Sequence, residues 1–86
     1  MDNDKKFLET LIKMLVADPK KVKVDRLVNE RGVLLTVDVA PEDLGTIIGK
    51  LGRNIDSIRH LVRLIGIQNK SFVSVKLNQP EKAGNK

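Results

Sequence analysis

In Ile47-Ile48-Gly49-Lys50-Leu51-Gly52-Arg53-Asn54-Ile55, two glycines stand two residues apart between apolar residues that are compatible with helices. This pattern predicts a tight loop joining two helices, because glycine adopts backbone angles closed to other residues and lets another backbone come close. Lys50 places a positive charge inside the loop, and Arg53 places another where the second helix begins and its N–H groups attract anions. The stretch therefore has the chemistry of a phosphate cradle.

Two elements are predicted in the first third of the chain. A first helix, which Asp2, Asn3 or Asp4 can cap, ends at Asp18-Pro19 because the residue before proline leaves the helical region. Its apolar residues recur at helical spacing, and we expect Phe7 and Met14 among its core residues. Lysines at 20, 21 and 23 then alternate with valines, which predicts a half-buried strand leading to a turn at 29–32. These lysines fit either edge-strand protection or contact with nucleic acid.

The strand predicted at 33–39 has Val33, Leu35, Val37 and Val39 on one face. Leu34 and Thr36 make its other face less polar than a solvated surface, so this strand is expected to be central or to line a groove. Pro41 suits the first turn of a short helix over 41–48, with Glu42 and Asp43 at its positive end.

A longer helix is predicted after Gly52, running to about residue 64 or 65, with Gly66 as its C-terminal stop. Ile55, Ile58, Val62 and Ile65 form its core stripe at 100° per residue. Leu61 and Leu64 lie outside that stripe, and we interpret them as a candidate dimer surface. A third strand follows at 72–77. Residues 78–86 have no apolar pattern, which predicts a disordered tail after a single domain over residues 1–77.

Charge is distributed unevenly along the 86 residues, which carry a net charge of +5. Residues 32–49 contain three acids and no base, whereas residues 50–63 contain four bases and one acid, so the sign changes at the glycine loop. One basic end is the expected footprint of a polyanion partner, although a solvated surface of mixed charge remains the alternative. Phe7 and Phe72 are the only aromatic residues, so a platform of stacked rings is not expected.

Several functional classes find little support in the composition. The chain has no cysteine, which excludes disulfides and thiolate metal sites, and its acidic N-terminus resembles neither a secretory signal nor a membrane span. We therefore expect a cytoplasmic protein. His60 has no nucleophile in a recognisable frame, and the loop lacks the Gly-Lys-Ser/Thr ending of a nucleotide-binding P-loop. Asp38, Glu42 and Asp43 suggest a metal site only weakly, so no enzyme, metal or cofactor is expected.

The loop and the order of elements together resemble the K-homology (KH) family. Two aliphatics, Gly-x-x-Gly, two residues and an isoleucine form its signature, seen here at residues 47–55. The order helix, strand, strand, helix, helix, strand resembles the type II variant over residues 4–77. The run Ala40-Pro41-Glu42-Asp43-Leu44-Gly45 leading into the loop resembles the small bacterial RNA-binding proteins of the KhpA family.

This resemblance implies an α+β fold with a three-stranded mixed sheet, the 33–39 strand in its middle and three helices on one face. It also implies that about four nucleotides of single-stranded RNA lie across the loop, with their bases toward an apolar groove. Gly49 and Gly52 would then admit the sugar-phosphate backbone, and Lys50 and Arg53 would meet phosphates. The base-facing residues would be Gly45 and Ile48, while Ile55 would support the loop from the core.

Leu51 departs from the polar or basic residue that is frequent at its position, and it can touch a base or sugar instead. The resemblance also implies a dimer, formed either with a second copy of the chain or with a second, larger KH-containing RNA binder that is linked to cell elongation and division. The resemblance thus implies a broadly specific RNA binder, acting as a post-transcriptional regulator or RNA chaperone. A protein-interaction module with the KH fold and little RNA binding is the alternative.

Overall fold

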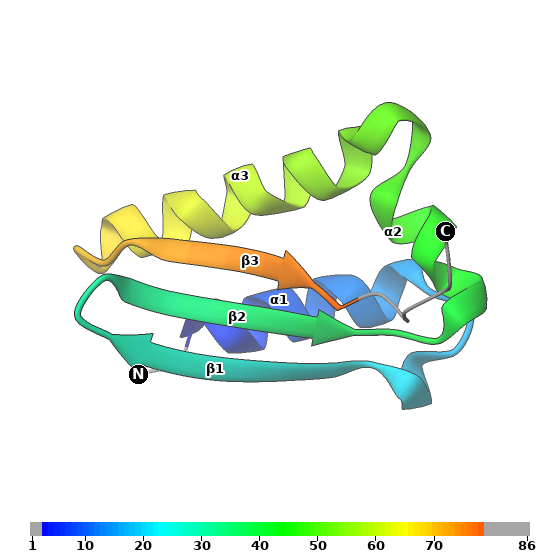
Figure 1. Cartoon of the computed structure of the whole chain (residues 1–86), viewed down its shortest axis with the longest axis horizontal. Helices are drawn as coiled ribbons and strands as arrows, with labels where there is room; N and C mark the ends of the chain where they lie inside the picture. Colours follow the sequence, from blue (N-terminus) through cyan, green and yellow to red (C-terminus); the bar gives the residue numbers. More distant parts are fainter. Residues whose placement is uncertain (1–2, 79–86) are drawn as a thin grey trace, which may run out of the picture.

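The computed structural model describes residues 3–78 of the chain and has the order helix, strand, strand, helix, helix, strand (Figure 1). Its elements are α1 (Asn3–Leu15), β1 (Lys23–Asn29), β2 (Gly32–Asp38), α2 (Leu44–Ile48), α3 (Arg53–Gln68) and β3 (Val73–Leu77). Short 3-10 turns precede β1, α2 and α3, at Pro19–Lys21, Pro41–Asp43 and Lys50–Gly52. The predicted α+β order of elements is therefore confirmed.

The sheet is mixed, and β2 is its central strand. It pairs antiparallel with β1 through a two-residue hairpin and parallel with β3, which returns after α3. The predicted middle position of this strand is confirmed. Figure 1 shows α1 crossing behind the sheet and α3 running alongside β3. In the same view, the glycine loop between α2 and α3 and the β1–β2 hairpin lie at opposite ends of the molecule.

One face of the sheet packs against the helices and forms the core. Val33, Leu35 and Val37 of β2 are buried there, in one cluster with residues of all three helices: Leu8, Ile12, Ile47, Ile55, Ile58 and Val62. The predicted core stripe of α3 is confirmed except at Ile65, which is only half-buried. On the opposite face of β2, Leu34 pairs with Leu27 of β1 and Ser74 of β3 and is partly exposed.

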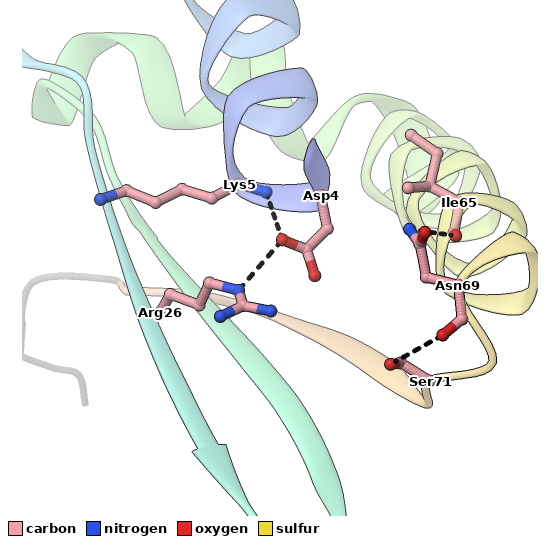
Figure 2. Close-up of polar contacts among 6 residues, drawn as sticks. All are labelled: Asp4, Lys5, Arg26, Ile65, Asn69 and Ser71. Atoms are coloured by element: carbon pink, nitrogen blue, oxygen red, sulfur yellow. Dashed lines mark hydrogen bonds and ion pairs between the residues drawn. The ribbon is translucent and has the colours of Figure 1, made fainter. Parts of the chain in front are cut away.

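An ion pair holds the start of α1 to β1. Figure 2 shows Arg26 reaching Asp4, whose carboxylate also accepts the Lys5 backbone N–H. The Arg26 Nε to Asp4 oxygen distance is 3.1 Å, and the Asp4 side chain is 7% exposed. A carboxylate this buried needs its partners, because an unpaired buried charge is strongly destabilising. Asp4 thus lies inside the first turn of α1 and connects that turn to the sheet.

Two predictions about the N-terminal third are wrong in detail. Met14 is 77% exposed, because it lies 200° around α1 from the fully buried Ile12. Lys20 and Lys21 belong to a 3-10 turn, so the strand begins only at Lys23. Within that strand Val24 alone is buried, which leaves most of β1 more exposed than the alternation predicts.

Gly66 lies inside α3, and the prediction that it ends the helix is wrong. The helix continues to Gln68, and the chain then turns at Asn69 and Lys70, where Lys70 has a φ of 56°. A Cβ on Gly66 would come within 2.7 Å of a Val73 methyl and 2.8 Å of the Ser71 carbonyl oxygen. Glycine is therefore required for the close packing of α3 on β3. Asn69 and Ser71 hydrogen-bond to backbone carbonyls at this turn (Figure 2).

The third strand is one residue shorter at its start than predicted. Phe72 precedes β3 and is 62% exposed, although its carbonyl accepts the Val33 N–H at 2.8 Å. At the other end, the Asn78 N–H donates to the Val37 carbonyl, so sheet hydrogen bonding reaches the first residue of the predicted tail. Residues 79–86 lie outside the described residues, and the disordered tail stays a prediction.

Candidate nucleic-acid interface

The glycine loop is a tight turn between α2 and α3. The Gly49 N–H donates to the Gly45 carbonyl at 2.8 Å, which closes α2, and the Gly52 N–H donates to the Gly49 carbonyl at 3.1 Å. Gly49, Leu51 and Gly52 have φ values of 75°, 58° and 75°. Three residues with positive φ in four reverse the chain direction, and glycine adopts this region at little cost.

Gly49 is required by its surroundings as well as by its backbone angle. A Cβ at this position would lie 2.5 Å from the side-chain amide carbon of Asn54. The Asn54 amide in turn donates to the Thr46 carbonyl at 2.8 Å, which holds the start of α3 to α2 across the loop. Asn54 was not among the predicted site residues, because a contact across the loop leaves no periodic signal in the sequence. Gly52 has open space where a Cβ would be, so only its φ value favours glycine.

Leu51 projects from the tip of the loop with 82% of its surface exposed. It is also one of two non-glycine residues with positive φ among residues 3–78, a conformation that L-residues adopt at a cost of roughly 1–2 kcal/mol. An exposed apolar side chain in a strained backbone conformation contributes little to the fold. Its position suits direct contact with a ligand.

The positive charges of the site surround this leucine. Lys50 and Arg53 are both exposed, before and after the loop tip. Further along α3, Arg59 donates from Nε to the Val75 carbonyl at 3.2 Å and covers the free edge of β3, and its guanidinium lies 3.7 Å from Asp56. In the sequence Arg59 is one of the four bases of residues 50–63, and the structure gives it a defined place between α3 and β3.

The predicted base-facing residues lie on α2, directly before the loop. Gly45 is exposed, with no atom near the place where its Cβ would be, and Ile48 is half-buried at the edge of the core. Ile55 is 7% exposed and belongs to the core, as expected for a residue that supports the loop from below. The structure thus brings the seven predicted loop and α2 residues together at one end of the molecule: Gly45, Ile48, Gly49, Lys50, Leu51, Gly52 and Arg53.

The two candidate interface leucines lie on α3 beyond this loop. Leu61 and Leu64 are 42% and 47% exposed. Leu61 lines a cavity of about 210 Å³ between α1, α2 and α3, whose other apolar walls are Leu11, Leu15 and Ile58. Leu15 is itself 43% exposed, so an apolar surface extends from α1 to α3.

The acidic and histidine residues have other roles or remain dispersed. Asp43 is buried, and its carboxylate accepts the backbone N–H groups of Ala17 and Asp18 at 3.0 and 3.1 Å, which holds the end of α1 to the start of α2. Its side chain makes no cap hydrogen bond to α2, so this tertiary contact replaces the predicted role at the helix start. His60 is exposed on α3. Within residues 3–78, no group of three or more His, Cys, Asp or Glu residues is placed to hold a metal.

Between residues 3 and 78, no helix is both long and apolar enough to cross a bilayer.

Comparisons with known proteins agree with the fold. A family model described as the KhpA/KhpB KH domain matches residues 5–78. The RNA-binding protein KhpA of Clostridium acetobutylicum is 37% identical over 73 residues, which are 85% of this chain and 97% of that protein. The RNA-binding proteins KhpA of Chlamydia pneumoniae and Mycobacterium tuberculosis are 36% identical over 73 residues and 41% identical over 59 residues. The first pair covers 85% of this chain and 94% of the relative, the second 69% and 74%. The chain therefore belongs to the KhpA/KhpB family of KH domains.

Proposed function

We propose that this protein binds single-stranded RNA across the loop at residues 49–52. The observation that carries the proposal is the loop itself, in which Gly49 and Gly52 make a tight turn that presents the exposed cations Lys50 and Arg53 on either side of the exposed Leu51. Backbone N–H groups and cations near the start of α3 suit phosphate oxygens. The names of the relatives, which describe RNA-binding proteins, support the same ligand class.

The same residues set the expected strength and selectivity of binding. Two loop cations supply a salt-dependent contact with phosphates but no sequence information. Bases would meet Gly45 and Ile48 of α2, which offer apolar contact and few hydrogen-bonding groups. We therefore expect weak, broadly specific binding, consistent with a post-transcriptional regulator or RNA chaperone, and stronger binding where two domains act on one RNA.

The proposal is tested by a charge reversal in the loop, Lys50→Asp combined with Leu51→Asp. We expect at least a tenfold loss of affinity for a single-stranded RNA, measured by fluorescence anisotropy, because repulsion replaces the phosphate contact. The fold should survive, since both side chains are exposed and aspartate tolerates positive φ better than leucine.

A matched control separates the site from the overall charge. Thr10→Asp with Lys20→Asp changes the net charge by the same amount at exposed positions on α1 and the following turn. This control should keep most of the wild-type affinity. Equal affinities for the wild type and the loop variant would refute the loop as the RNA site.

We further propose that Leu61 and Leu64 form a dimer surface, either with a second copy or with a second KH-containing RNA binder. Their exposure and the apolar cavity beside Leu61 support an interface. The resemblance to the family leads us to expect the second partner to be linked to cell elongation and division. If RNA binding proved absent, this surface would favour the alternative of a protein-interaction module.

The oligomeric state tests this surface. Leu64→Asp, and separately Leu61→Tyr, should convert a dimer to a monomer in light scattering at high concentration. Leu27→Asp is the control, since Leu27 is comparably exposed but lies on the sheet face away from the helices. A monomeric wild type at the highest concentration reached would remove the homodimer, and co-purification with the second KH protein would then be compared between wild type and Leu64→Asp.

A further inference from the structure

A second hollow lies at the end of the molecule opposite the glycine loop. It has a volume of about 320 Å³ and is lined by Asn29, Arg31, Gly32, Val33, Leu34, Phe72 and Ser74. The β1–β2 hairpin and the turn between α3 and β3 meet at this end (Figure 1). Leu34 pairs with Ser74 in the sheet register, and both point away from the core face on which Val33 and Val73 are buried. The hollow therefore opens on the sheet face that the helices leave uncovered.

The side chains around this hollow offer three different kinds of contact. Phe72 presents a ring that is 62% exposed, and Leu34 supplies an apolar floor. Asn29 and Ser74 bring side-chain hydrogen-bonding groups, and Arg31 is the only charged residue among the described residues that line it. A ring for stacking, polar groups at its side and a guanidinium nearby match a nucleobase and its phosphate better than they match an apolar protein surface.

The backbone of the β1–β2 hairpin packs closely against the backbone of Phe72. Gly32 has a φ of 129°, and a Cβ on it would collide with the Phe72 carbonyl oxygen. The same carbonyl accepts the Val33 N–H, so the position of Phe72 is fixed by the sheet even though its ring is exposed. An exposed aromatic ring on a fixed backbone loses little freedom when a base stacks on it.

The distance to the glycine loop suits one continuous strand of RNA. The glycine loop lies directly before the N-terminal end of α3, and Phe72 lies shortly after the C-terminal end of α3. The 16 residues of α3 span about 24 Å, at about 1.5 Å per residue. A stacked strand advances about 3.4 Å per nucleotide, so about seven nucleotides bridge this distance, and fewer do so if the strand is extended.

We propose that Phe72, with Arg31 and Leu34, forms an additional nucleobase subsite for RNA that leaves the glycine loop along α3 and passes the free edge of β3 to the uncovered face of the sheet. This inference rests on the proposed function, because the loop supplies the anchor. It predicts that the length of RNA matters. A strand of four nucleotides anchored at the loop does not reach Phe72, whereas a strand of ten does.

Two RNA lengths and three proteins test the subsite. The wild type should bind a ten-nucleotide single strand more tightly than a four-nucleotide one. Phe72→Ala should weaken binding of the longer strand about five- to tenfold and leave the shorter one unchanged, since stacking on an aromatic ring is lost. Phe72→Tyr keeps a ring and should retain wild-type affinity for both.

A direct spectroscopic readout accompanies the affinities. The chain has only two phenylalanines, so fluorine labelling gives two signals, and Phe7 serves as the internal reference. The Phe72 signal should shift with the longer strand and not with the shorter. The proposal is overturned if that signal does not respond to the longer strand, or if Phe72→Ala weakens both strands alike or neither. It is also overturned if Phe72→Ala changes the oligomeric state, which would make this face a protein interface.

The proposed function fails in a different way. If neither strand binds the wild type, the loop site is wrong, and the subsite falls with it. If both strands bind and only the loop variant loses them, the loop is the RNA site and Phe72 is not part of it.

Discussion

The two ends of α3 present different surfaces, and we propose that RNA contacts both. At the N-terminal end, Leu51 projects between Lys50 and Arg53, and three residues with positive φ make the turn. At the C-terminal end, Gly66 is buried against β3, and a hollow opens beside Phe72 with Arg31 as its only charged lining residue among those described. The surface at the first end suits a charged sugar-phosphate backbone, and the proposed ligand at the second end is a nucleobase.

The two surfaces correspond to the two kinds of contact in RNA binding, contacts with phosphates and contacts with bases. Phosphate contacts hold a strand in place and depend on salt, whereas contacts with bases provide selectivity and depend on it less. Glycines also act differently at the two ends. Gly49 and Gly52 shape an exposed turn, whereas Gly66 allows a helix and a strand to approach closely. Changes at each end should therefore have different effects on stability and on binding.

The largest effect is expected from Gly49→Ala. Positive φ and the collision with Asn54 should together lower the free energy of unfolding by about 2–4 kcal/mol, measured by chemical denaturation. Gly45→Ala is the matched control, because Gly45 is helical with open space around it, and alanine there should stabilise by up to about 1 kcal/mol. Equal stabilities of the two variants would show that the loop geometry is wrong.

Gly66→Ala should affect the other end by a smaller amount. The gain in helix propensity of about 1 kcal/mol is outweighed by overpacking against Val73 and the Ser71 carbonyl, which leaves a net loss of about 1–2 kcal/mol. Denaturation measures this loss, and affinity for a four-nucleotide strand should stay at the wild-type value in the folded protein. A stabilised Gly66→Ala protein would mean that α3 and β3 are not so closely packed.

Salt dependence should distinguish the two ends in binding. With two phosphate contacts, affinity should fall about sevenfold between 50 and 200 mM salt, from a slope of about −1.4 on logarithmic axes. Lys50→Ala should reduce this slope by about 0.7, whereas Phe72→Ala should leave it unchanged. Anisotropy titrations at several salt concentrations measure both slopes. An unchanged slope for Lys50→Ala would argue that its ammonium group does not contact phosphate.

The smallest effect is expected at Leu51. Leu51→Asn should stabilise the protein by about 0.5 kcal/mol, because asparagine tolerates the left-handed region better than leucine. The same change should reduce RNA affinity if the leucine contacts a base or sugar. Thermal unfolding and anisotropy on one preparation give both values. A gain in stability without any loss of RNA affinity would show that the Leu51 side chain does not contact RNA.

Much of the fold could be predicted from local patterns. The alternation over residues 33–39 and the stripe through Ile58 and Val62 follow directly from strand and helix periods, and both lie in the core. The tight turn at the loop was also predictable, because two glycines at this spacing between helical segments favour backbone angles that reverse the chain. These features are local, so a short window of sequence contains the information.

The missed features depend on contacts between distant parts of the chain. Met14 has the same apolar character as Ile12, and only the packing of α1 decides which of them is covered. In the sequence Gly66 has the features of a residue that ends a helix, and only its contact with Val73 shows that glycine is needed there for close packing. Asp43 binds backbone groups 25 and 26 residues earlier in the chain, and Asn54 reaches across the loop to Thr46. The periodic pattern of apolar residues in the sequence does not reveal such hydrogen-bond partners.

The proposed path of RNA from the glycine loop to Phe72 can be tested in the amide NMR spectrum of isotope-labelled protein, titrated with a ten-nucleotide single strand. We expect the largest shifts at Gly49, Leu51, Gly52 and Arg53, reversed by salt, with a second, weaker group at Gly32, Phe72 and Ser74. Shifts confined to α1 and the Leu61 side of α3, with the loop amides unchanged, would contradict RNA binding at the loop.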